Sequence, residues 1–272
     1  MSPPFATPRA RALGFGMKKA RLARKLGVRE LARLAQLSPQ EISNWEHGKR
    51  VPRPEEVATI LAVLRVAPDE RARLFDLVRH ANEPDWLAAA TFVEYERTAS
   101  AMVQWAPSLV PGLLQTPAYI RALFATTPRA KADIEERVMR RLARREVLSS
   151  RHALPFRAVL GEAVLHLNIG GREVMAEQLR HVLAVSRARN VSVRVLPEGC
   201  GHHPGLYGPF VIFDFADLPP IVYLELYRGN GYLYHREHVA DYRSAAESLS
   251  ALALSESESE RLIQGVLAEL EA

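Results

Sequence analysis

Two amide side chains, Gln40 and Asn44, lie four residues apart in a short polar stretch and would share one face of a helix. Ser43 falls beside them, whereas Ile42 and Trp45 fall three apart on the opposite, apolar side. Carboxamides both donate and accept hydrogen bonds, which is the chemistry that reads the edges of DNA bases. We therefore expect the polar face to point outward toward nucleic acid and the apolar face to enter a core.

A second group that could carry chemistry is the thiol and imidazole set of Cys200, His202 and His203 in the glycine-rich segment 198–205. Such groups could ligate a metal ion or act as nucleophile and base. However, adjacent ligands rarely converge on one ion without a fourth group, and no acid partner is evident. A plain loop around a buried His203 is favoured over a ligand or partner pocket lined by His202, His203 and Tyr207, and over catalysis. We accordingly expect no catalytic residue, no metal and no cofactor.

The elements that would position the amides form a tight helix-turn-helix pattern. Ser38 and Glu41 have the spacing of a capping box, and Pro39 would occupy the first helical position, where its missing N–H costs nothing. The preceding helix, 28–35, carries an apolar stripe of Val28, Leu31, Ala32, Leu34 and Ala35. Only Gln36, Leu37 and Ser38 separate the two helices, so a sharp turn with Leu37 as its buried plug is predicted.

Three more helices are expected around this pair. Residues 9–25 form a helical stretch dense in arginine and lysine, and Pro54 and Pro68 each open a helix with acidic residues in its first turn, the second running to about His80. Val57, Ile60, Leu61 and Leu64 form the apolar stripe of the former helix. The sequence therefore predicts a five-helix domain over residues 1–81.

This pattern resembles the phage-repressor-like (XRE-type) helix-turn-helix family. The resemblance is carried by Val28-Arg29-Glu30-Leu31-Ala32, Leu37-Ser38, Ile42-Ser43, Trp45-Glu46, Gly48-Lys49-Arg50 and Pro52. It implies base contacts from Gln40 and Asn44, with Ser43 beside them and Pro39 giving only apolar contact. It also implies a buried ion pair between Arg21 and Glu46.

The chain departs from this family where the second helix begins. Gly27 stands where a serine or threonine usually caps the helix, and Val28 stands where a polar residue often touches phosphate. We therefore assign phosphate contacts to cationic side chains, namely Lys18, Arg29, Lys49, Arg50 and Arg53.

The charge distribution favours the same interpretation. Residues 1–53 hold 12 lysines and arginines against 3 acids, a local excess of 9, while the whole chain carries +5, so residues 54–272 carry about −4. Positive potential concentrated on one domain favours nucleic-acid binding driven by counterion release.

The remaining sequence predicts an α+β protein that is mainly α-helical. Residues 82–150 are interpreted as a helical connector after a hinge at Asn82-Glu83-Pro84, with Trp86, Phe92, Tyr95, Met102 and Trp105 at near-helical intervals. Its last helix, 128–150, would expose five arginines (Arg137, Arg140, Arg141, Arg144 and Arg145) beside the acids Glu135, Glu136 and Glu146. Residues 151–272 should form a small mixed or antiparallel sheet of four or five strands, packed with helices.

The expected strands are 156–160, 191–195, 210–215, 221–226 and an edge strand at 231–234. The expected helices are 172–189, ended by Asn190 as a left-handed cap, then 238–254 and 256–270, the last opened by a capping box of Ser255 and Glu258. The second strand alternates cleanly, and the third and fourth should form an antiparallel pair around Pro219-Pro220.

The apolar segments and the cysteine content of the sequence indicate the cellular compartment. Residues 98–120 are free of charge, but Pro107, Pro111 and Pro117 break any membrane span, so two helix ends and a buried loop are expected there. The first eight residues lack the apolar core of a signal peptide and are interpreted as a frayed arm. The single cysteine suits a reducing compartment. We expect a cytoplasmic, nucleoid-associated protein with no membrane contact.

The C-terminal half resembles DUF5753, a domain of unknown function attached to helix-turn-helix domains in sporulating, filamentous actinobacteria. The matching segments are 109–116, 140–148, Val195-Leu196-Pro197, His203-Pro204-Gly205 and Gly208-Pro209-Phe210. The resemblance implies a developmental or antibiotic-production regulator, often encoded beside a small partner protein. It implies no ligand, reaction or catalytic residue.

Three functions follow as hypotheses. The first is a sequence-specific regulator of transcription that binds double-stranded DNA, as a homodimer, and whose C-terminal domain receives a signal from a small protein or a small molecule. The second is an antitoxin-like protein at a promoter, paired with a small cognate protein. The third is an enzyme tethered to DNA that uses the loop of His202 and His203.

Overall fold

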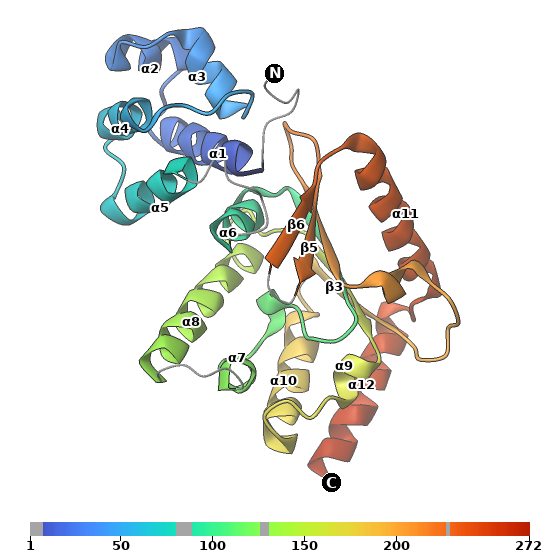
Figure 1. Cartoon of the computed structure of the whole chain (residues 1–272). Coiled ribbons are helices and arrows are strands. Elements are labelled where there is room, and N and C mark those ends of the chain that lie inside the picture. The colour runs from blue at the N-terminus through green and yellow to red at the C-terminus, as the bar shows by residue number, and fades with distance from the viewer. Residues whose placement is uncertain (1–7, 80–88, 126–130, 227–228) are drawn as a thin grey trace. The chain divides into compact units, whose positions relative to one another are not determined.

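The computed structural model describes residues 8–79, 89–125, 131–226 and 229–272. The predicted N-terminal arm, the hinge at Asn82-Glu83-Pro84 and Trp86 lie outside these residues. The chain divides into two compact units, one of residues up to Thr98 with Leu226–Tyr232 and one of Ala99–Glu225 with Leu233–Ala272. Figure 1 shows the helices and strands of both units.

The first unit is a helical bundle. Its helices are α1 (Pro8–Ala23), α2 (Val28–Ala35), α3 (Pro39–Glu46), α4 (Pro54–Val63), α5 (Pro68–Arg79) and α6 (Ala89–Thr98). The five helices predicted for the N-terminal domain are confirmed, and α6 packs on α1 and α5 as a sixth. The apolar stripe predicted for α2 is wrong at one position, because the Leu34 side chain is 45% exposed. Leu37, predicted to be buried in the turn, is only half-buried.

Backbones approach closely where α1 crosses the end of α3. A Cβ added to Gly14 would lie 2.3 Å from the carbonyl oxygen of Trp45, so a side chain at this position would push the two helices apart. Leu13, Met17, Ile42 and other fully buried side chains fill the space between the helices. The bundle core therefore depends on glycine as well as on apolar residues.

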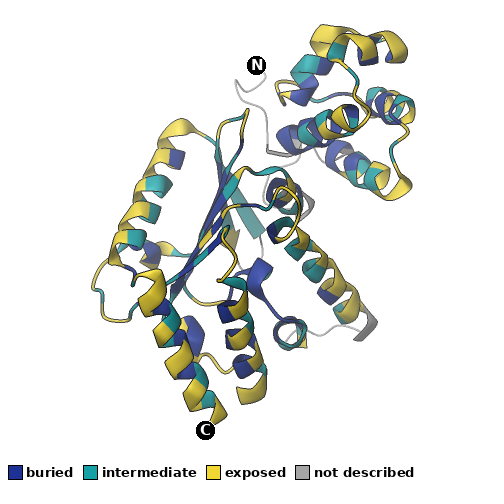
Figure 2. Ribbon diagram, turned by 180° about the vertical axis from the view of Figure 1, so that it is seen from behind, coloured by how far each residue is buried: buried dark blue, intermediate teal, exposed yellow. Residues whose placement is uncertain are grey.

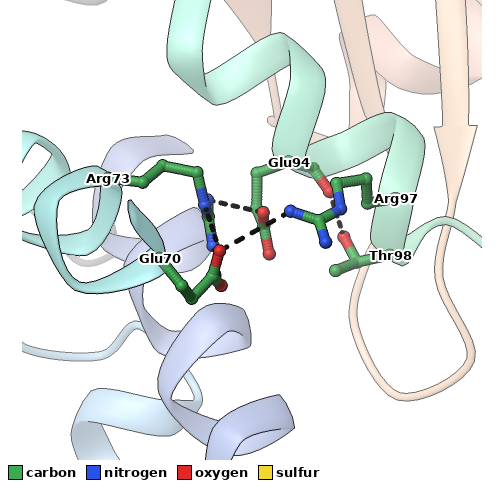
Figure 3. A network of polar contacts seen from close by, with 5 residues as sticks. All are labelled: Glu70, Arg73, Glu94, Arg97 and Thr98. Atoms are coloured by element: carbon green, nitrogen blue, oxygen red, sulfur yellow. Dashed lines mark hydrogen bonds and ion pairs between the residues drawn. The ribbon is translucent and has the colours of Figure 1, made fainter. Parts of the chain in front are cut away.

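A polar network joins α6 to α5 (Figure 3). Arg73 binds Glu70 in a bidentate pair, Nε to Oε2 at 2.9 Å and Nη2 to Oε1 at 2.5 Å, and its Nη1 lies 2.6 Å from Oε2 of Glu94. The Glu94 side chain is 1% exposed, and this burial raises its pKa, while the cations of Arg73 and Arg97 oppose the shift. The pKa of Glu70 is lowered by its hydrogen bonds from Arg73. One arginine therefore holds two carboxylates from different helices.

The second unit contains a mixed sheet. Its strands are β1 (Ala101–Ala106), β2 (Phe156–Gly161), β3 (Val191–Leu196), β4 (Phe210–Asp214) and β5 (Ile221–Leu226). The sheet continues into β6 (Gly229–Leu233), whose residues up to Tyr232 are grouped with the first unit. Among the described residues the order is β3-β2-β1-β4-β5-β6, open at both edges. β1, β2 and β3 are parallel, whereas β4 is antiparallel to both β1 and β5. The β4–β5 pairing and the edge position of β6 confirm the sequence prediction.

The strand β1 is the main correction to the predicted secondary structure. Residues 98–120 were expected to be two helix ends and a loop, but Met102 and Trp105 lie on a strand that occupies the middle of the sheet. Most of its side chains are buried, so the strand lacks the alternating pattern of a half-exposed one. The predicted helical connector is therefore interrupted by a strand.

The remaining elements of this unit are helical: the 3₁₀ turns η2 (Gly112–Leu114), η3 (Arg144–Leu148) and η4 (Pro204–Tyr207), and helices α7 (Pro117–Ala125), α8 (Lys131–Ala143), α9 (Ala163–His166), α10 (Arg172–Val185), α11 (Arg236–Leu252) and α12 (Glu256–Glu271). α12 packs on α10 and β3. Figure 2 shows the outer faces of α11 and α12 exposed, whereas strands β1 to β4 are mostly buried. The capping box of Ser255 and Glu258 is confirmed. The prediction that Asn190 ends the helix 172–189 as a left-handed cap is wrong. α10 ends at Val185, and its C-cap residue, Ser186, has a right-handed backbone conformation.

Candidate nucleic-acid interface

Helix α3 is anchored by its apolar side. Ile42 and Trp45 are buried in the bundle core, as expected from their spacing. Pro39 is the first residue of the helix, where the ring fits the helical backbone without losing a hydrogen bond. The buried face fixes which side chains of this eight-residue helix remain outward.

The outward face carries the predicted base-contacting side chains. Pro39 and Gln40 are exposed, while Ser43 and Asn44 are half-buried. Nε2 of Gln40 donates to Oδ1 of Asn44 at 3.2 Å. This bond does not use the side-chain oxygen of Gln40 or the side-chain nitrogen of Asn44. The pair therefore presents an acceptor, the Gln40 oxygen, and a donor, the Asn44 nitrogen. Adenine offers the complementary N6–H donor and N7 acceptor in the major groove.

The predicted capping box at the start of α3 is wrong. Ser38 has the extended backbone of an N-cap, with φ −73° and ψ 131°, but its side chain makes no cap hydrogen bond. Glu41 is exposed instead of reaching back to the Ser38 backbone. The beginning of the helix therefore relies on Pro39 and on the packing of Ile42.

The end of α3 is fixed by a Schellman motif. The N–H of Lys49 donates to the carbonyl of Asn44 at 2.8 Å, and the N–H of Gly48 donates to that of Trp45 at 2.9 Å. Gly48 has φ +65°, and a Cβ there would lie 2.7 Å from Cγ of Arg11. Glycine is therefore required here for both its backbone conformation and its small size.

The expected ion pair between Arg21 and Glu46 is present and buried. Nε and Nη2 of Arg21 each lie 2.7 Å from one oxygen of Glu46, and Nη1 donates to the carbonyl of Leu26 at 2.7 Å. The side chains are 8% and 2% exposed, and hydrogen bonding to Glu46 raises the pKa of Arg21. The pair ties the end of α1 to the end of α3, and so fixes the angle at which α3 is presented.

The cationic residues predicted to contact phosphate lie on several elements. Arg29, Lys49, Arg50 and Arg53 are exposed, and Lys18 on α1 is half-buried. Arg53 binds Glu56 at 2.8 Å, and the Glu56 carboxylate also accepts the Arg53 backbone N–H at 2.7 Å. Phosphate binding by Arg53 would therefore have to compete with a local ion pair that opens α4.

Helix α2 begins without a side-chain cap. Gly27 is its N-cap residue, and no side chain accepts a hydrogen bond from the first turn. The amide groups of that turn carry the positive end of the helix dipole, and the turn holds both the cation Arg29 and the acid Glu30. A phosphate oxygen is a suitable acceptor for such a start.

The loop of Cys200, His202 and His203 does not assemble a reactive cluster. The thiol of Cys200 bonds to the Pro197 carbonyl, the His202 ring contacts Tyr207 edge-on at 6.1 Å, and the His203 ring contacts Trp105 at 5.9 Å. Tyr207 is 85% exposed, so it does not line an enclosed pocket. Within the described ranges, no three histidine, cysteine, aspartate or glutamate side chains gather as metal ligands.

The same loop covers the centre of the sheet. Nε1 of Trp105 donates to the carbonyl of Gly205 at 2.9 Å, and a Cβ on Gly205 would lie 2.6 Å from the indole. His203 is half-buried, and its Nδ1 has no hydrogen-bond partner among the described residues. These contacts agree with the structural interpretation of the loop.

The arginines of α8 and η3 do not form one solvated face. Arg140 pairs with Glu136 at 2.6 Å on the surface, as expected. In contrast, Arg141 turns inward, donating to Oε1 of Gln115 at 2.8 Å and lying over the ring of Phe124. Arg145 is also half-buried.

Sequence reasoning also missed two arginines whose side chains donate to backbone carbonyls. Arg24 donates to the carbonyls of Leu64 and Arg65 at the end of α4, and Arg194 donates to those of Ala253 and Leu254 after α11. Both follow a common rule, since arginine side chains satisfy the last carbonyls of helices. No local spacing identifies them, because their partners lie at least 40 residues away.

Family models match both parts of the chain. A helix-turn-helix domain matches residues 12–74, and a domain of unknown function, DUF5753, matches residues 89–265. No curated protein and no solved structure matches the chain significantly. In the part of the chain that the structure describes, no helix is long and apolar enough to cross a membrane. A helix-turn-helix domain with a buried anchor and an exposed amide face is a DNA-binding domain, and the chain belongs to the DUF5753 family.

Proposed function

We propose that this protein is a sequence-specific regulator of transcription that reads operator bases with α3. The observation that carries the proposal is the presentation of Gln40 and Asn44, linked to each other on the outward face of a helix whose other face is locked into the core. The Arg21–Glu46 pair holds that helix in place, so the amides need little ordering when DNA binds.

We further propose that the protein binds as a homodimer and acts in the cytoplasm, on the nucleoid. Helix-turn-helix dimers place two recognition helices in successive major grooves, about 34–36 Å apart. The operator should accordingly be a two-fold motif with half-sites one helical turn apart.

The C-terminal domain is proposed to receive a signal from a small protein or a small molecule and to carry no catalysis. Its mixed sheet and surrounding helices make a separate compact unit. This proposal is supported by the loop of His202 and His203, whose two imidazoles pack against different aromatic side chains.

The test is selection of binding sites from random duplex DNA with the intact protein, followed by titration of operator variants. Gln40→Ala and Asn44→Ala should each cost about 1–3 kcal/mol at one base position while nonspecific affinity is largely kept. Glu41→Ala, on the same helix, is the matched control and should not change base preference. If both amide variants weaken all sequences equally, the proposed recognition face is wrong.

Salt dependence separates phosphate contacts from base contacts. Lys49→Ala should reduce the slope of log affinity against log salt by about one unit. Arg71→Ala removes the same charge from α5, a helix whose main contacts are with α1, α4 and α6, and should leave the slope unchanged. An unaltered slope for Lys49→Ala would remove this residue from the phosphate set.

A further inference from the structure

The second unit contains a cleft of about 450 Å³ where η2, α8, η3 and the start of β3 come together. Six apolar side chains line it: Leu113, Leu142, Leu148, Val185, Ala188 and Val191. The volume lies within the range of about 300–1,000 Å³ that is usual for small-molecule sites. An apolar cleft of this size has room for a compact organic molecule.

The walls of the cleft are held together by hydrogen bonds. Nδ2 of Asn190 donates to the carbonyls of Leu148 and Leu154, at 3.1 and 3.0 Å. These bonds join the segment after η3 to the turn between α10 and β3. The cleft is therefore formed before any ligand arrives, as is typical of small-molecule sites.

One half-buried cation, Arg145, lies among these apolar walls. Its Nη2 is 2.6 Å from Nε2 of His181, and among the described residues no carboxylate pairs with it. Burial lowers the pKa of Arg145, and burial together with this cation lowers the pKa of His181. His181 is therefore a neutral acceptor that satisfies one N–H of Arg145 without neutralising its charge.

Neighbouring arginines pair with carboxylates, whereas Arg145 contacts an imidazole. Arg140 pairs with Glu136 and Arg121 pairs with Glu135, and all four of these side chains are exposed. Arg145 is less exposed than either arginine, yet its described partner is an imidazole. Partial burial of a cation without an anion costs free energy of folding, and an apolar residue at this position would avoid that cost. The charge of Arg145 therefore calls for an explanation other than stability.

We infer that this cleft binds a small organic carboxylate, with the carboxylate on Arg145 and an apolar aryl or alkyl body against the leucines and valines. A guanidinium binds a carboxylate through two parallel hydrogen bonds, which fixes the orientation of the ligand. Ser149 adds a hydroxyl at the lining. Glu146 also lines the cleft, but it is exposed, so solvent screens its charge more than that of Arg145.

The ligand would supply the small-molecule signal for the C-terminal domain. That consequence rests on the proposed function, whereas binding itself does not. The experiment below therefore contains no DNA, and failure of operator recognition would leave its outcome unaffected.

The test is calorimetric titration of the intact protein with 2-naphthoate and with decanoate, using the neutral 2-naphthamide for comparison. We expect saturable binding of at least one carboxylate with one site per chain. Arg145→Gln should weaken that binding at least about tenfold, because a charge-assisted pair is lost, and should leave any naphthamide binding unchanged. Arg140→Gln makes the same change of charge at an exposed position and should have no effect.

A second variant tests the location without touching the charge. Ala188 is exposed at the lining, so Ala188→Trp should fill the cleft and abolish carboxylate binding without lowering the melting temperature. This variant also decides the outcome if Arg145→Gln does not fold. No saturable binding of either carboxylate to the native protein would overturn the inference, as would binding that survives both variants.

Discussion

Replacing Glu46 by alanine leaves the guanidinium of Arg21 buried without the carboxylate that holds it. Two hydrogen bonds of 2.7 Å are lost, each worth about 1.5–3 kcal/mol for a charged group. Arg21 keeps its bond to the carbonyl of Leu26, which offsets part of the loss. We therefore expect the helix-turn-helix unit to lose about 3–5 kcal/mol, as for other broken buried pairs.

Hydrogen exchange of the intact protein, followed by mass spectrometry, measures this loss locally. Amides of α1 and α3 should exchange roughly 100 times faster or more, because each 1.4 kcal/mol changes an opening equilibrium tenfold. Peptides from the sheet of the second unit provide an internal reference. Glu41→Ala is the matched control on the same helix, and an exposed side chain without a cap bond should cost less than about 0.5 kcal/mol.

A double variant separates two explanations of the loss. Arg21→Met with Glu46→Leu removes both charges, so it should recover most of the stability that Glu46→Ala loses. Equal protection in Glu46→Ala and Glu41→Ala would refute the reasoning, since the pair would then contribute nothing. A double variant as unstable as Glu46→Ala would show that packing, and not an unpaired charge, causes the loss.

Three further outcomes are expected. Arg65 has a left-handed backbone with φ +48°, so Arg65→Gly should stabilise the first unit by about 0.5–1 kcal/mol in urea unfolding, whereas Gly48→Ala should destabilise it. The raised pKa of Glu94 means that its contribution to stability is complete below the ordinary glutamate value of 4.5 and is lost as pH rises through the folded value. Protection of α6 amides, corrected for intrinsic exchange, should therefore fall above pH 4.5 in the native protein and stay level in Glu94→Gln; the same fall in both would exclude Glu94 as the cause.

The helix-turn-helix unit could be predicted from the sequence because its signals are local. Pro39, Gly48 and the spacing of Ile42 and Trp45 each act within one or two helical turns, and each holds in the structure. The failed capping box at Ser38 shows the limit of such signals, since a cap needs a side-chain rotamer as well as the right residue types. The exposed Leu34 shows that an apolar residue can extend a helical stripe without being buried.

The sheet could be predicted only in part because its centre depends on distant pairing. Met102 and Trp105 lie three residues apart, which suits a helix as well as a strand with two buried faces. What makes this segment a strand is its position between β2 and β4, and that pairing leaves no local trace in the sequence. The same argument applies to Arg145, whose histidine partner lies 36 residues further along the chain.

The central position of β1 has a consequence for the order in which the protein is made. The contacts that α1 to α5 make with one another lie within the first 79 residues, and α6, which packs on α1 and α5, ends at Thr98, so these helices can fold soon after they leave the ribosome. β1 follows it closely in the chain, but its partner β2 begins 55 residues after β1 begins, and β4 begins 109 residues after it. Strands that are far apart in the sequence pair slowly. In the nascent chain, helices α1 to α5 would therefore be folded before β1, with Met102 and Trp105, has paired with β2 or β4. Until synthesis has passed Asp214, the apolar side chains of β1 therefore lack the paired strands that bury them in the folded protein.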